Sequence, residues 1–160
     1  MRTIEKSVEI DAPPASVWAA LTNSRLVSRW ANAFLEGLTC DSRWKTGDKL
    51  LWKEKDGAVV MHGKIVTADP ERRLEVCFPP ELNLACEGMD PEFSETYAIE
   101  PQEEGVRLSI VCGPVHLVDL DTLDPKWDEA LATIKELAEA PDRRSRSKRA
   151  ESEERDASPA

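Results

Sequence analysis

The 160-residue sequence has few of the residues that usually build metal centres and catalytic triads. Its two histidines, His62 and His116, lie far apart, and its four cysteines include no CxxC pair. The seven glycines form neither a GxGxxG nor a GxxxxGK phosphate loop, and no serine lies in a GxSxG elbow. The sequence therefore predicts no metal site, no cofactor and no nucleotide enzyme of a familiar class. The cysteines are expected to act as small apolar residues in a reducing compartment.

Long apolar runs and an excess of basic residues are also missing. No run approaches the roughly 18 apolar residues of a membrane span, and the first ten residues lack the apolar core of a secretory signal. Acidic residues outnumber basic residues by 31 to 21, a formal net charge of −10, which disfavours nucleic acid and anionic membranes as partners. We therefore expect a cytoplasmic monomer or homodimer that binds neither nucleic acid nor membranes.

The composition changes near residue 140. Residues 141–160 contain three alanines as their only apolar residues, together with six basic and five acidic side chains. Such a segment cannot bury enough apolar surface to offset its ordering entropy. We therefore expect one domain over residues 1–140, with a net charge of −11, and a disordered charged tail over residues 141–160, with a net charge of +1.

Apolar periodicity and turn residues predict an α+β domain in which an antiparallel sheet packs around one long helix. Helices are expected at 14–22 after a cap candidate at Asp11, after Asn23 and Ser24, and from Asp124 and Pro125 to about residue 138. A loop is expected at 79–92, and residues 116–121 are interpreted as a solvated loop rather than as a site that places carboxylates beside His116. Strands are expected at 3–10, 49–55, 58–67, 74–78, 93–100 and 106–112, with Asp56 and Gly57 as a two-residue hairpin turn.

The sequence resembles the Hsp90-ATPase-activator-like branch of the START-like superfamily, also called SRPBCC proteins. The likeness begins with residues 4–22 (IEKSVEIDAPPASVWAALT) and extends to about residue 138. Its further matches are Trp30, Gly47-Asp48, Trp52, Asp56-Gly57, the GKIV of 63–66, the DPERRL of 69–74, the GVRL of 105–108, Trp127 and Leu131.

This resemblance implies a helix-grip fold: a curved antiparallel sheet of six or seven strands around the C-terminal helix, with two short helices after the first strand. Members bind lipids, hormones, polyketides or other apolar molecules in a cavity between sheet and helix, and a few catalyse cyclisation or hydrolysis. The family label also implies a chaperone partner and a link to stress response. One departure is Cys112, which stands where relatives often have a histidine near the end of the last strand.

Glu95 is the main candidate for chemistry. Strict alternation with Phe93, Tyr97 and Ile99 would point its carboxylate into an apolar cavity, where desolvation raises the pKa and suits a ligand-orienting group or a general acid/base. A bulge or an edge position would instead let Glu95 reach solvent, which is the commoner fate of glutamate. If it points inward, Tyr97 and Arg107 are its nearest polar residues in sequence, although Arg107 is expected on the opposite face.

The tryptophans and their neighbours complete the expected site. Trp18 and Trp127 are interpreted as core, whereas Trp30 and Trp52 are pocket candidates whose indole N–H groups could hold a polar ligand group. Met61 would line the cavity in one phase of strand 58–67, and His62 in the other. The expected ligand-binding residues are Trp30, Trp52, Met61, Phe78, Glu95, Tyr97, Cys112 and Leu131.

The leading functional hypothesis is binding of a small, largely apolar molecule between sheet and helix. The alternatives are a cyclase- or hydrolase-type enzyme that uses Glu95, with His62 as a second candidate group, and an interaction module for a chaperone of the Hsp90 type.

Overall fold

The computed structural model describes residues 2–83, 93–115 and 117–157. It contains seven strands, two short helices, one 3-10 turn and one long helix within these residues. In chain order these elements are β1 (Arg2–Ile10), α1 (Pro14–Thr22), α2 (Ser24–Ala31), β2 (Thr39–Asp41), β3 (Lys49–Lys53), β4 (Val59–Asp69), β5 (Arg73–Cys77), η1 (Pro80–Leu82), β6 (Ser94–Pro101), β7 (Val106–Val115) and α3 (Leu117–Ala157).

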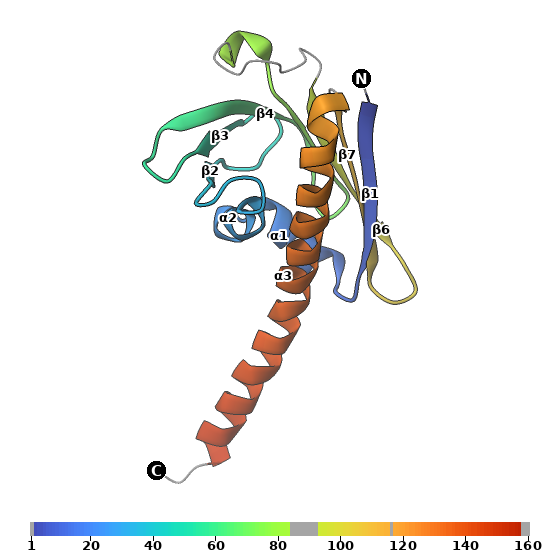
Figure 1. The fold of residues 1–160 in the computed structure, drawn as a ribbon. Helices are drawn as coiled ribbons and strands as arrows, with labels where there is room; N and C mark the ends of the chain where they lie inside the picture. The colour runs from blue at the N-terminus through green and yellow to red at the C-terminus, as the bar shows by residue number, and fades with distance from the viewer. Residues whose placement is uncertain (1, 84–92, 116, 158–160) are drawn as a thin grey trace.

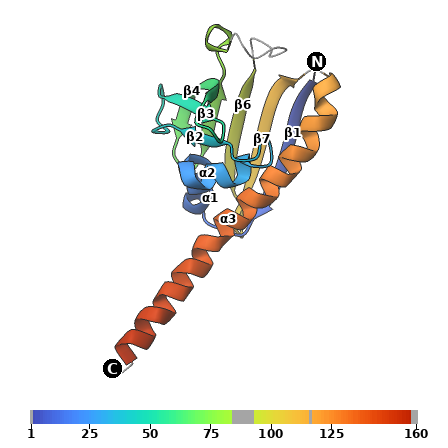
Figure 2. The ribbon, with the colours of Figure 1, turned by 60° about the vertical axis from the view of Figure 1, so that its left-hand side comes forward.

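All seven strands form one antiparallel sheet in the order β1-β7-β6-β5-β4-β3-β2. The sheet curves around the helices, and Figures 1 and 2 show α1, α2 and the first half of α3 on the same side of it. The core lies between these two layers. This arrangement confirms the α+β helix-grip architecture expected for the domain.

The two short helices begin for different reasons. The Asn23 side chain caps α2 by accepting hydrogen bonds from the backbone N–H groups of Arg25 and Leu26, at 3.0 and 3.4 Å. In contrast, α1 starts after Pro13, which has no side-chain capping bond, with proline in its first turn. The cap expected at Asp11 is therefore wrong, since this residue lies two positions before the helix cap.

The hairpin between β3 and β4 is less regular than predicted. The two strands stop at Lys53 and resume at Val59, so the connection has five residues rather than the expected two. Within β4 the register slips: Trp52 pairs with Met61 but Lys53 pairs with Val59, which leaves Val60 as an extra residue. This β-bulge turns the side chains that follow it and decides which of them reach the interior.

The long helix begins earlier than expected. It starts at Leu117, so the segment interpreted as a solvated loop at 116–121 is helical from Leu117 onward, and His116 lies outside the described residues. On β1, the ammonium group of Lys6 bonds to Asp124 at 2.9 Å and to Asp128 at 2.7 Å and so links the edge strand to α3. The backbone of residues 141–157 continues the helix away from the domain (Figures 1 and 2). The disordered tail stays a prediction.

Candidate functional site

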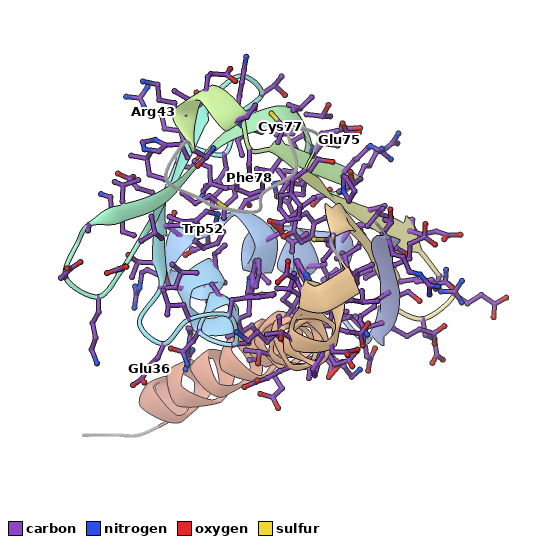
Figure 3. All side chains as sticks on the ribbon, turned by 45° about the horizontal axis from the view of Figure 1, so that its top comes forward. Glu36, Arg43, Trp52, Glu75, Cys77 and Phe78 are labelled. Atoms are coloured by element: carbon purple, nitrogen blue, oxygen red, sulfur yellow. The ribbon has the colours of Figure 1, made fainter. Side chains whose placement is uncertain are left out.

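A cavity of about 270 Å³ opens between the sheet and the helices. Most of its wall is apolar, and its residues come from α2, the segment after α2, four strands and α3. Its lining residues are Trp30, Ala31, Phe34, Leu35, Leu38, Trp52, Val60, Met61, Phe93, Glu95, Cys112, Leu123 and Trp127. Figure 3 shows Trp52 inside the body of the protein, whereas Glu36 and Arg43 lie at the periphery.

Glu95 reaches this cavity because β6 is regular. The strand is paired on both sides, with Val76 of β5 and Cys112 of β7 opposite Glu95, and neither ladder shifts register. The bulge or edge position that would release the side chain to solvent is therefore absent in this strand. The Glu95 side chain is half-buried, and its exposed part borders the cavity.

The surroundings of Glu95 favour its neutral form. Burial raises the pKa of this carboxyl group from 4.5 to about 7, against the opposing effect of a hydrogen bond from the Tyr97 hydroxyl to Oε2 at 2.9 Å. Burial and the neighbouring Glu95 charge also hold the pKa of Tyr97 well above 10, so the phenol stays a donor. Arg107, the other partner considered, pairs instead with Glu9 at 3.1 Å.

Aromatic rings surround this carboxylate. Trp30, Tyr97 and Trp127 form a triangle with ring centroids 6.2 to 6.4 Å apart, and the edge of Phe34 packs on Trp127 at 4.8 Å. The indole N–H of Trp30 is already used, because it donates to the carbonyl of Ala20 at 2.9 Å. The expectation that it could hold a polar ligand group is therefore wrong.

The other polar groups of the cavity are a thiol and an indole. Burial, with a smaller effect from the Glu95 charge, raises the pKa of Cys112, and a hydrogen bond from Trp127 opposes this shift. A thiol that remains protonated cannot replace an acid–base histidine at neutral pH. No side-chain hydrogen bond joins Trp52 to another described residue, and the use of its indole N–H by a ligand stays a prediction.

One wall of the cavity is attached directly to the long helix. Lys126 of α3 donates from Nζ to the carbonyl oxygen of Phe34 at 3.2 Å, next to the contact between Phe34 and Trp127. The segment after α2 therefore has both a polar and an aromatic connection to α3.

Across the described residues, no group of three or more His, Cys, Asp or Glu side chains is arranged to hold a metal ion.

The comparison with known protein families agrees with this geometry. The family model described as "Activator of Hsp90 ATPase homolog 1-like protein" matches residues 11–139. The chain belongs to this family. The family match excludes only the first ten residues and the charged C-terminal segment. No curated protein sequence matches the chain significantly.

Solved structures show the same fold as this family member. A protein from Mesorhizobium loti superposes with a TM-score of 0.68 at 18% identity, covering 85% of this chain and 96% of its own. One from Chromobacterium violaceum has a TM-score of 0.66 at 20% identity, covering 86% and 96%. The Aha1 dimer from Colwellia psychrerythraea has a TM-score of 0.66 at 15% identity, covering 87% and 97%. At these identities the likeness establishes the fold alone.

The structure brings five of the eight expected site residues to the main cavity: Trp30, Trp52, Met61, Glu95 and Cys112. Tyr97 lies behind Glu95, next to a void of about 10 Å³, and contributes through its hydrogen bond. Phe78 and Leu131 are buried but do not line the cavity, since Phe78 packs against Phe93 at 5.4 Å and Leu131 lies elsewhere on α3. His62 is absent from the lining because the bulge at Val60 places Met61 inward.

Several lining residues were missed by sequence reasoning. Phe34, Leu35 and Leu38 lie in an irregular segment, Leu123 lies where a loop was expected, and Trp127 was assigned to the core. The helical spacing of Leu120, Leu123 and Trp127 was the available signal for an earlier start of α3.

Among the described residues, no helix is long and apolar enough to cross a membrane. A cytoplasmic location stays a prediction.

Proposed function

We propose that this protein binds a small, largely apolar molecule in the cavity between the sheet and α3. The observation that carries the proposal is an apolar cavity of about 270 Å³ bordered by a single carboxylate, Glu95. Cavities of this kind bury most of a ligand's apolar surface and use a few polar groups to orient it. Because a cavity of about 150 Å³ accommodates benzene, this one is suited to a molecule of about two fused rings.

A blocking variant tests the proposal. Met61 lines the cavity, so Met61→Trp is expected to fill part of it, whereas Val66→Trp on the same strand adds the same ring at an exposed position. Gently purified protein is analysed by native mass spectrometry and by solvent extraction. A small molecule retained by the wild type and by Val66→Trp, but lost from Met61→Trp, supports binding in the cavity. Equal retention by all three proteins, or none by the wild type, contradicts it.

A second candidate function is acid–base catalysis by Glu95. The observation in its favour is a carboxyl group inside the cavity with a pKa of about 7, where one group can both accept and donate a proton. Wild type and Glu95→Gln are incubated separately with a cell metabolite extract, which is then profiled by mass spectrometry. A compound converted by the wild type and not by the variant supports catalysis. Identical profiles contradict it.

A chaperone partner of the Hsp90 type is supported by the family membership and by the acidic charge of residues 1–140. Immobilised protein is expected to retain the chaperone at low salt and to release it as salt rises, because the attraction would be electrostatic. No retention at low salt contradicts the proposal.

A further inference from the structure

We infer that the ligand of this cavity carries a protonated amine, which pairs with Glu95 while the rest of the molecule lies against the aromatic rings. This inference rests on the proposed binding function and narrows it to one chemical class, a small lipophilic amine. Its basis is a carboxylate that no cationic side chain among the described residues pairs with, beside the rings of Trp30 and Trp127, whose indole N–H groups are already bonded.

Among the described residues, no cationic side chain pairs with the Glu95 carboxylate. Its hydrogen bond from Tyr97 occupies Oε2, and no lysine, arginine or histidine side chain is among the described residues that line the cavity. An ionised carboxylate in an apolar environment is costly unless it is paired. An ammonium group beside Oε1 would supply both the missing charge and a charge-assisted hydrogen bond.

The aromatic wall also favours a cation. The indole N–H groups of Trp30 and Trp127 are already bonded, to the carbonyl of Ala20 and to Cys112, so these side chains offer a ligand their ring surfaces. The face of an indole ring attracts a cation, and it is also a good apolar contact. Both properties match the ring system and the ammonium group of a lipophilic amine. The net charge of −11 on residues 1–140 acts in the same direction over a longer range.

Among the described residues of this site, Glu95 is the group with a pKa near neutral pH. Next to it are Tyr97 on β6 and Cys112 on β7, and Cys40 on β2 lies near Tyr97; burial raises the pKa of all three, so they stay neutral. The facing residues of β5, β3 and α2 are Val76, Trp52 and Trp30, which do not titrate. On α3, Lys126 lies at the cavity wall, where its Nζ is bound to the Phe34 carbonyl.

Three probes with one ring system separate charge from apolar contact. They are 1-naphthylmethylamine, the neutral 1-naphthylmethanol and the anionic 1-naphthoate, and binding is measured by isothermal titration calorimetry at pH 8.0 and pH 5.5. At pH 8.0 the amine is expected to bind at least tenfold more tightly than the alcohol. Between pH 8.0 and 5.5 its affinity is expected to fall by up to roughly thirtyfold, because only ionised Glu95 is competent. The affinity for the alcohol should change little.

Two variants assign this effect to Glu95. Glu95→Gln is expected to remove the preference for the amine and its pH dependence, whereas Glu100→Gln, an exposed position on the same strand, should keep both. Tyr97→Phe removes a hydrogen bond that lowers the pKa of Glu95, so the midpoint of the pH dependence should move upward. This variant keeps the carboxylate and tests the inference even if Glu95→Gln folds poorly.

The outcomes distinguish the inference from the proposed function. Equal binding of the amine and the alcohol at pH 8.0 overturns the inference and leaves the binding function intact. Tighter binding of 1-naphthoate, through the Trp52 N–H, has the same consequence. An amine preference that persists in Glu95→Gln also overturns it. Failure of all three probes to bind overturns both.

Discussion

Replacing Glu95 by glutamine is expected to stabilise the protein above neutral pH and to have much less effect in acid. The carboxyl group has a pKa of 4.5 when exposed and of about 7 in the folded protein, mainly because burial disfavours its charged form. A raised pKa of an acid means that the folded state holds the proton more tightly than the unfolded state. Stability from this group is therefore fully present below pH 4.5 and is lost as the pH rises toward 7.

The size of this effect follows from the two pKa values. The rise in pKa from 4.5 to about 7 corresponds to roughly 3 kcal/mol of unfolding free energy once the group is ionised in both states. By the same linkage, the loss is less than about 1 kcal/mol at pH 5.0 and roughly 3 kcal/mol at pH 8.0. The neutral glutamine is unaffected, so the variant should gain roughly 2 kcal/mol on the wild type between these conditions.

Urea unfolding of both proteins at pH 5.0 and 8.0 measures this difference. Other carboxylates titrate equally in the two proteins, so they cancel in the comparison, and Glu100→Gln serves as the control for removing one acidic charge from β6. The reasoning is refuted if the gap in unfolding free energy between wild type and Glu95→Gln is the same at both pH values. It is also refuted if the wild type gains stability relative to the variant as the pH rises.

Three further predictions concern the rest of the fold. Gly105→Ala should destabilise the protein by more than about 2 kcal/mol in urea unfolding, because its φ is +78° and a Cβ would clash with the Ile10 carbonyl oxygen. Gly57→Ala, which has a positive φ but open space, should cost only about 1 kcal/mol, and equal costs would contradict this reading. Lys6→Met should cost about 0.5–1 kcal/mol at low salt and less in 1 M salt, since its two aspartate partners are solvent-exposed. Deleting residues 141–160 should leave the Tm within about 2 °C, because an isolated charged helix adds little stability, and a larger drop would show that this segment packs on the domain.

Local patterns left the orientation of Glu95 open and favoured solvent exposure. Alternation along β6 offered the inward direction, shared with Tyr97, and the structure shows this direction because the ladders on both sides are regular. The competing outcome, a bulge, depends on how neighbouring strands pair. Such irregularities do occur elsewhere in the sheet, and at the one at Val60 of β4, apolar residues on both faces conceal the change of phase.

The limits of the cavity were harder to predict than its position. Helical periodicity identified Leu131 as buried, and strand alternation did the same for Phe78, but burial alone does not say which part of a core is hollow. The wall formed by Phe34 and Leu38 has no regular period, and its place depends on contacts with α3 that are distant in sequence. Such contacts leave no local signal.

The pairing of β1 with β7 has a consequence for the order in which the chain folds. Arg2 pairs with Val115 and Ile10 with Val106, so the first strand finds its neighbour only after more than two thirds of the chain has been made. Contacts of such long range slow folding and leave early strand edges exposed during synthesis. The helix α3, which forms one wall of the cavity, is synthesised later still. A molecule bound at the proposed site therefore could not assist the early steps of folding, because the cavity forms only when translation of the domain is nearly complete.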